Sequence, residues 1–166
     1  MPGHHLAQVN IARLLAPLDS PELAGFVANL ERINALADGS QGFVWRLQAD
    51  GGDATSIRAF DDDWLLVNMS VWESLESLRD FVYNSRHVEV LRRRREWFER
   101  LADVHLALWW LPAGELPTLD EAKRRLETIR RLGPTPEAFT FRAPFEPPAG
   151  NRRLGPAVDA EFCWTA

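Results

Sequence analysis

Three segments of the chain alternate between apolar and polar residues with a period of two, which is typical of strands that bury one face. They are residues 6–15, 43–48 and 64–72, and the third segment has the cleanest alternation. A fourth, mostly apolar run at residues 105–111 also predicts a strand. The pattern therefore predicts four strands, joined by turns or by longer helical segments.

The other periodic segments repeat apolar residues every three or four positions, which predicts amphipathic helices. The first predicted helix covers residues 21–38. The second covers residues 73–101 and is expected to break into two helices near Ser85. The last covers residues 118–133 and begins at Thr118 with the pattern of a capping box, which satisfies free backbone amides at a helix start.

The order strand, helix, strand, strand, helix, strand predicts an α+β protein with a ferredoxin-like βαββαβ fold. Such a fold has a four-stranded antiparallel sheet, and here an extra C-terminal helix and an extended tail follow it. We expect one domain at residues 1–133. The tail, at residues 134–166, is rich in proline and glycine and is expected to pack on the same domain or on a partner subunit.

The alternation also sorts the strand residues onto two faces of the sheet. One face is apolar and is expected to pack under the helices, and it contains Val9, Ile11, Phe43, Trp45, Leu47, Val67, Met69 and Val71. The other face is too polar for a dry core and is flanked by aromatic groups, and it contains Gln8, Asn10, Arg46, Asn68, Ser70 and Trp72. We expect this second face to line a cavity that two sheets share, while a solvated sheet surface is the simpler alternative.

Composition narrows the possible partners. The 166 residues include 19 Lys and Arg against 24 Asp and Glu, a net charge of −5 that argues against nucleic-acid binding. We expect no membrane association and a cytoplasmic protein, because no apolar run approaches the length of a membrane span and the start lacks a secretory pattern. The 4 histidines show no spacing typical of a metal site, so none is predicted. The expected partners are a small molecule and a second copy of the chain.

Part of the chain resembles a known superfamily. Residues 71–87, with the sequence VWESLESLRDFVYNSRH, resemble the W-E-S-x-E-x-L-x-x-F-x-x-S-x-H run of the dimeric α/β-barrel proteins, the superfamily of the antibiotic biosynthesis monooxygenases. About residues 5–142 resemble a bacterial family known as domain of unknown function 3291, through runs such as HLAQVNIARLLAPLD, HVEVLRRRREWFE and GPTPEAFTFR. The resemblance implies a ferredoxin-like subunit that forms a homodimeric barrel through its sheets, and it implies no established activity.

Several residues are candidates for chemistry at such a site. His87 ends the matched run and is predicted to act as an acid or base, with helix capping as the simpler interpretation. Tyr83 is predicted to donate a hydrogen bond, and Asn10 to orient a substrate oxygen, unless these groups only satisfy each other within the protein. The side chains expected to bind substrate are Gln8, Arg46, Asn68, Ser70, Trp72 and Phe81.

The superfamily includes heme-degrading members. Their pattern has an asparagine on the first strand, a tryptophan on the helix after the third strand, and an iron-ligating histidine ten residues further on. By resemblance Asn10 matches the first of these, whereas Phe81 takes the tryptophan position and Leu91 takes the histidine position. The usual iron ligand is therefore missing and no cofactor is expected, with heme held by His87 as the alternative.

Three functional hypotheses follow. The leading one is a small-molecule enzyme of the antibiotic biosynthesis monooxygenase-like type, which oxygenates, isomerises or cyclises an aromatic or polyketide-like substrate without a cofactor. The second is a non-catalytic metabolite-binding or stress-response protein. The third is a heme-binding protein.

Overall fold

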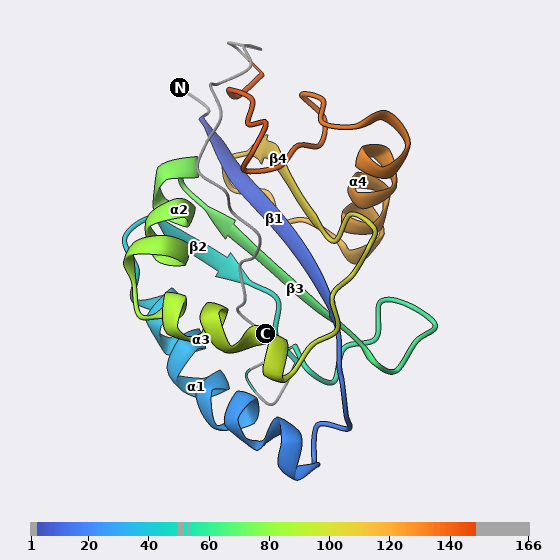
Figure 1. The fold of residues 1–166 in the computed structure, drawn as a ribbon. Helices are drawn as coiled ribbons and strands as arrows, with labels where there is room; N and C mark the ends of the chain where they lie inside the picture. The colour runs from blue at the N-terminus through green and yellow to red at the C-terminus, as the bar shows by residue number, and fades with distance from the viewer. Residues whose placement is uncertain (1–2, 50–51, 53, 149–166) are drawn as a thin grey trace.

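The computed structural model describes residues 3–49, 52 and 54–148. Its centre is a four-stranded antiparallel sheet with the strand order β2-β3-β1-β4 (Figure 1). The strands are β1 (His4–Arg13), β2 (Phe43–Arg46), β3 (Leu65–Trp72) and β4 (Leu106–Pro112). The helices are α1 (Ala24–Asp38), α2 (Leu75–Asn84), α3 (His87–Arg93) and α4 (Leu119–Leu132), with 3₁₀ turns at Pro21–Leu23 and Arg94–Glu96.

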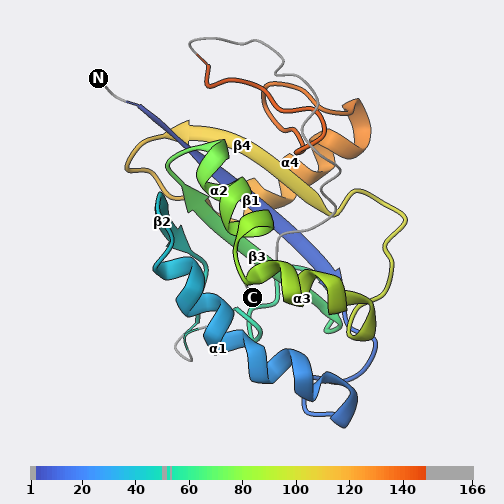
Figure 2. The same ribbon diagram turned by 60° about the vertical axis from the view of Figure 1, so that its left-hand side comes forward.

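Both faces of the sheet are covered by helices. In the two ribbon views α1, α2 and α3 lie together on one side of the sheet, whereas α4 lies on the opposite side (Figures 1 and 2). Along the chain the elements follow the predicted βαββαβ order, with α2 and α3 forming one broken crossover. This α+β architecture is compatible with a ferredoxin-like fold, and α4 is the additional C-terminal helix that the sequence predicts.

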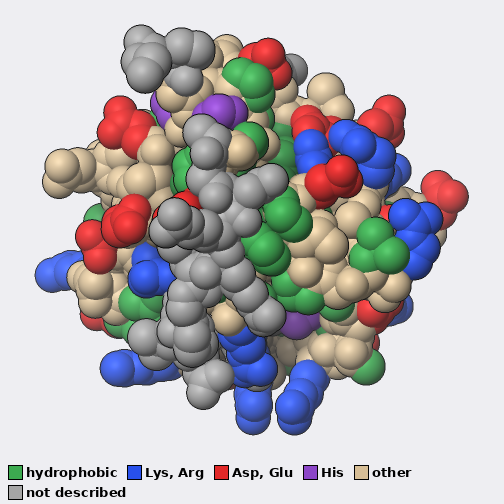
Figure 3. Space-filling view, turned by 90° about the horizontal axis from the view of Figure 1, so that it is seen from above, with side chains coloured by type: hydrophobic (Ala, Val, Ile, Leu, Met, Phe, Trp, Pro, Cys, Tyr) green, Lys and Arg blue, Asp and Glu red, His purple; other side chains and the backbone are tan. Residues whose placement is uncertain are grey.

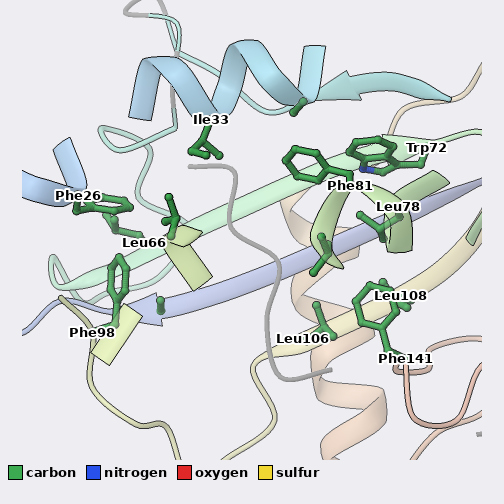
Figure 4. Packing of buried hydrophobic residues seen from close by; sticks show 14 of the residues in the cluster. Phe26, Ile33, Leu66, Trp72, Leu78, Phe81, Phe98, Leu106, Leu108 and Phe141 are labelled. Atoms are coloured by element: carbon green, nitrogen blue, oxygen red, sulfur yellow. The ribbon is translucent and has the colours of Figure 1, made fainter. Parts of the chain in front are cut away.

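Each face of the sheet contributes to its own apolar cluster. Between the sheet and α1–α3 lies the larger cluster, part of which is drawn in Figure 4; it includes Leu6, Phe26, Leu66, Trp72, Phe81, Trp97, Leu108 and Phe141. The second cluster lies between the sheet and α4 and includes Val9, Ile11, Val67, Met69, Val71, Trp109, Leu126 and Ile129. Burial of each large apolar side chain stabilises the fold by about 1.5–3 kcal/mol, so both layers contribute to stability.

The sequence analysis predicted that the face with Val9, Val67 and Val71 packs under the helices that connect the strands, and this prediction is wrong. Val9, Val67 and Val71 pack toward α4, and the face with the polar side chains turns toward α1–α3. Alternation shows which residues share a face, but not which helices cover that face. Phe43 also leaves its predicted face, because a β-bulge at Val44 shifts the register and places Phe43 opposite Trp72.

The α4 side of the sheet is closed within a single chain. Ala7, Val71 and Trp109 on this face are 0% exposed. They are covered by α4 and by a segment that contains Ile57, Ala59 and Phe60. The expected barrel would place one face of each sheet toward a second copy. Because α4 covers this side of the sheet, the sheet of a second copy can pack against it only if α4 moves away.

The long helical segment breaks where the sequence predicts, but it ends earlier. Ser85 separates α2 from α3, and the helical turns stop at Glu96 rather than continuing to Leu101. The reason is that the next residues pair with the end of β1 instead. The carbonyl of Trp97 accepts a hydrogen bond from the amide of Leu15 at 2.9 Å, and the amide of Glu99 donates to the carbonyl of Arg13 at 2.8 Å.

Residues 134–148 lie against the free edge of β4. The backbone of Phe139 exchanges two hydrogen bonds of 2.8 Å with Leu108, and the indole of Trp110 donates to the carbonyl of Phe145 at 2.8 Å. Phe139 and Phe141 are 0% exposed. This part of the predicted tail therefore belongs to the larger apolar cluster, and residues 149–166 of that tail lie outside the described residues.

The turn between α1 and β2 depends on a glycine. Gly42 has φ of +80°, and a Cβ atom at this position would lie 2.6 Å from the Cβ of Ser77 on α2. The carbonyl of Gly42 also accepts a hydrogen bond from the amide of Glu73 at 2.7 Å, so the backbone has no room to move away. The turn and α2 are thus held in direct contact.

We expect the substitution Gly42→Ala to lower the free energy of unfolding by about 2–5 kcal/mol, as the sum of a left-handed backbone and an overpacked contact. The matched control is Gly114→Ala, since Gly114 has φ of +94° but no atom within 4 Å of the added Cβ. That variant should lose only the backbone contribution of about 1–2 kcal/mol. Urea unfolding of both variants measures the difference, and equal losses would show that the contact with Ser77 is unimportant.

Candidate functional site

Four polar side chains lie together in the middle of the helix-covered face of the sheet. On neighbouring strands Gln8 is directly opposite Ser70, and Asn10 is directly opposite Asn68. Each of the four is no more than 1% exposed. We call this group, Gln8, Asn10, Asn68 and Ser70, the polar block. Apolar pairs bound it at both ends of the strands, so the sheet presents a polar patch surrounded by hydrophobic surface.

Hydrogen bonds connect most of the polar block. The amide nitrogen of Gln8 donates to Oδ1 of Asn68 and to Oγ of Ser70, the second bond at 3.0 Å. The indole nitrogen of Trp72 donates to the same Ser70 oxygen at 2.9 Å. Ser70 therefore joins the amides of the block to the aromatic core beside it.

Three atoms of the polar block have no such partner. Among the residues that the structure describes, nothing hydrogen-bonds to Nδ2 or Oδ1 of Asn10 or to Oε1 of Gln8, although all three atoms are buried. A buried polar atom without a partner costs about 1–3 kcal/mol. Native proteins retain few such atoms, and each calls for a physical explanation. These atoms therefore lack the hydrogen bonds that buried polar atoms usually make.

A row of aromatic rings adjoins the polar block. Phe81 of α2 stacks on Trp72 with ring centroids 5.1 Å apart and planes inclined by 27°. Phe81 also meets the ring of His87 at 4.9 Å, and Phe43 and Trp72 meet edge to face at 5.4 Å. Figure 4 shows Trp72 and Phe81 next to each other in the cluster. Trp72 and Phe81, both predicted to contact substrate, are thus parts of one aromatic wall.

His87 is 0% exposed and is the first residue of α3. Its side chain does not cap the helix, because Ser85 takes that role: the Ser85 oxygen accepts a hydrogen bond from the backbone amide of His87 at 3.1 Å. The Ser85 hydroxyl also donates to the carbonyl of Phe81. Ser85 thus positions His87, and its identity as a serine at a helix break is the signal that the sequence offers for this role.

Tyr83 does not join His87 on one helix face. The helix break at Ser85 separates the two residues into α2 and α3, so their spacing of four positions does not place them together. Instead, the ring of Tyr83 meets the edge of Phe141 at 6.1 Å, on the side of the tail. Tyr83 therefore packs at a different part of the cluster from the Phe81–His87 contact.

Arg46 is held away from the polar block by other partners. Its guanidinium binds Asp38 at the end of α1 through two hydrogen bonds of 2.8 and 3.3 Å, and it donates to the carbonyl of Gly52 at 2.6 Å. The predicted substrate-binding arginine thus closes the corner between α1 and β2. Asp38 is the partner that the sequence analysis missed, because eight residues and a turn separate the two in the chain.

Two open hollows in the surface lie beside Phe81 and Arg46. One has a volume of about 540 Å³ and lies between the α1–β2 turn and α2, with Phe81 and Ser85 among its lining residues. The other has a volume of about 450 Å³ and lies beside α1, with Asn34 and Arg46 in its wall. The first hollow reaches Phe81, which also contacts Trp72 and His87.

The run of four arginines at residues 92–95, at the end of α3 and in the turn after it, is mostly a surface feature. Arg93 lies over the ring of Trp97 at 5.0 Å and pairs with Glu96 at 3.0 Å. The hydrogen bond from Arg93 lowers the pKa of the Glu96 carboxyl below its ordinary value and raises the pKa of Arg93. In the view of Figure 3, acidic and basic side chains lie beside each other at several places on the described surface.

The residues do not fit the heme pattern of the resembling superfamily. Leu91, at the position of the iron ligand, is a partly buried member of the apolar cluster and has no atom that binds iron. Among the described residues, no group of three or more His, Cys, Asp or Glu side chains is placed to hold a metal ion. None of the helices in the described part is long and apolar enough to span a membrane.

Comparisons with known proteins give a family and two distant structures. The family model described as "Domain of unknown function (DUF3291)" matches residues 5–154. The crystal structure of PA3566 from Pseudomonas aeruginosa is 13% identical and covers 70% of this chain and 99% of its own, with a TM-score of 0.45. A protein of unknown function from Nitrosomonas europaea, NE2512, is 11% identical and covers 71% and 99%, with a TM-score of 0.43. A search of curated proteins finds no match.

The unpartnered amide of Asn10 predicts an unusual effect on stability. We expect Asn10→Leu to raise the free energy of unfolding by about 1 kcal/mol or more, because an apolar group of similar shape removes the desolvation cost. For a chain of this size the melting temperature should rise by roughly 2–4 °C. Differential scanning calorimetry measures both quantities.

The matched control is Asn29→Leu on α1. Both ends of the Asn29 amide have partners, since Nδ2 donates to the carbonyl of Gly25 and Oδ1 accepts from Arg32, each at 2.7 Å. This variant should be neutral or less stable than the wild type. A loss of stability in Asn10→Leu would mean that the Asn10 amide is satisfied in the free protein, for example by a structural water.

Proposed function

Since the chain belongs to the DUF3291 family, whose function is unknown, we propose a function from the geometry of the polar block. In this proposal the protein binds a small, flat organic molecule between its own sheet and the helices α2 and α3. It then moves a proton on that molecule without a metal or an organic cofactor. The isomerisation of an aromatic or polyketide-like compound needs only these steps, and a cyclisation adds one bond, which the enolate carbon forms to a second carbonyl group whose oxygen takes the proton.

The observation that carries the proposal is the buried, unpartnered amide of Asn10 together with Oε1 of Gln8. A fold that had no use for these atoms would be more stable with apolar side chains there. A ligand that bonds to them recovers the cost of their burial at the moment of binding. Polar groups placed in an otherwise apolar enclosure are the usual composition of small-molecule sites.

The surroundings favour a flat ligand. Trp72, Phe81 and His87 form a continuous wall of rings, and aromatic faces stack best on other planar groups. Leu106 and Leu108 of β4 lie opposite Asn10 and Gln8, and they complete an apolar border around the block. A planar ring with polar edges satisfies both the wall and the block.

His87 is the proton-transfer group of the proposal. A neutral imidazole takes a proton from a carbon next to a carbonyl group, the resulting enolate oxygen accepts a hydrogen bond from Nδ2 of Asn10, and the imidazolium returns the proton to another carbon. No electron leaves the substrate, so this isomerisation requires no oxidant. The resemblance of residues 71–87 to the antibiotic biosynthesis monooxygenase superfamily supports the same site, because that resemblance ends at His87.

Native mass spectrometry of the protein purified from its own host tests binding. We expect a bound compound that denaturation releases from the wild type and from Asn29→Leu. Asn10→Leu should carry at least about fivefold less of it, since loss of a buried hydrogen-bonding partner costs about 1–3 kcal/mol. Wild-type protein that carries no compound, or equal loading of the two variants, would contradict the proposed binding site.

Deuterium exchange tests the proton transfer separately. The released compound, returned to wild-type protein in D₂O, should gain mass at a carbon position, and His87→Gln should slow this exchange by about 10²-fold or more while binding is retained. Equal exchange rates in the two proteins would remove His87 from the chemistry. A compound that binds through Asn10 but never exchanges would instead favour the second hypothesis, a non-catalytic metabolite-binding protein.

A further inference from the structure

We infer that the ligand is uncharged and presents a hydrogen-bond donor and an acceptor side by side on a planar ring, as a cyclic amide (lactam) does. The inference rests on the proposed function and specifies its substrate class. It follows from counting which donors and acceptors of the polar block are already used, and which remain buried without a partner.

Gln8 can only accept a hydrogen bond from the ligand. Its amide nitrogen has two N–H groups, and these point to Oδ1 of Asn68 and to Oγ of Ser70. The remaining atom, Oε1, is a buried acceptor without a partner among the described residues. The ligand therefore needs a donor for Gln8, such as an N–H or an O–H group, in addition to the donor and acceptor that pair with Asn10.

Asn10 offers a donor and an acceptor together. Both atoms of its side-chain amide are buried and unpartnered within the described part of the chain. A side-chain amide pairs best with a group that has an acceptor next to a donor, because two parallel hydrogen bonds then form at once. The same two-bond geometry lets asparagine recognise the edge of adenine. The N–H and C=O of a lactam have this arrangement.

The charges on this face argue against an anionic ligand. All four members of the polar block are neutral, and Asn10 lies among apolar neighbours such as Leu106. One buried cation on this face, Arg46, already binds Asp38 and the carbonyl of Gly52. A carboxylate or phosphate buried at the block would lack a compensating charge from these groups, which is costly in an apolar interior.

Binding of two bicyclic probes of the same shape tests the inference. 2-Quinolone has an N–H next to its carbonyl, whereas coumarin has a ring oxygen in place of that N–H. By isothermal titration calorimetry we expect 2-quinolone to bind the wild type with at least about fivefold lower Kd than coumarin, because coumarin leaves Oδ1 of Asn10 unpaired. N-Methyl-2-quinolone should bind as weakly as coumarin.

The Asn10 variants show where the discrimination arises. In Asn10→Leu the Kd ratio of the two probes should fall to about one, and in Asn29→Leu it should equal the wild-type ratio. Equal affinities in the wild type would overturn the inference, and so would a preference for 2-quinolone that persists in Asn10→Leu.

The compound released from host-purified protein separates failure of the inference from failure of the proposed function. A bound compound that depends on Asn10 but has no adjacent donor and acceptor would overturn the inference and leave the proposed site intact. Protein that carries no compound and binds neither probe would overturn both.

Discussion

The structure depends on how four polar side chains are buried in the centre of a sheet. Hydrophobic packing alone does not explain Gln8, Asn10, Asn68 and Ser70 at positions where the sheet meets α2 and α3, because polar atoms cost free energy when they leave water. Hydrogen bonds across the strands satisfy part of the block, and the remaining cost is offset by apolar burial elsewhere. The layer between the sheet and α4 is one source of that burial, since it is formed almost entirely from aliphatic and aromatic side chains. This additional layer lets the chain tolerate buried polar atoms on the other side of the sheet.

Much of the fold could be predicted from periodicity because periodicity records burial directly. The four strands, the broken crossover and the start of the last helix were found near their predicted positions, and Thr118 caps that helix as its pattern indicates. The face of the sheet under the crossover helices was predicted wrongly for a physical reason. When helices cover both faces, both carry apolar residues, and the alternation contains no sign of which helix lies where. The bulge at Val44 was equally invisible, since one extra residue in a short edge strand leaves the local pattern unchanged.

The candidate site was likewise predictable from the sequence only in part. Strand alternation placed Gln8, Asn10, Asn68 and Ser70 on one face, and the structure shows them as direct cross-strand neighbours. The surroundings of Arg46 and Tyr83 were not predictable, because they depend on contacts between distant elements: a carboxylate at the end of α1 in one case, and Phe141 of the tail in the other. The contact between Phe81 and His87 was not predictable from helical spacing either, because the break at Ser85 lies between the two residues.

The choice of amides rather than charged groups has a consequence for selectivity. A charged side chain at position 10 would attract a ligand of opposite charge, but in the absence of that ligand its burial would cost far more than that of an amide. An amide keeps the free protein folded at a modest cost, and it supplies a donor and an acceptor in a fixed relation. Sites of this type discriminate strongly, because an analogue that lacks one matching group leaves a buried polar atom unpaired. The polar block is therefore suited to distinguish molecules of equal shape by the pattern of hydrogen-bonding groups along one edge.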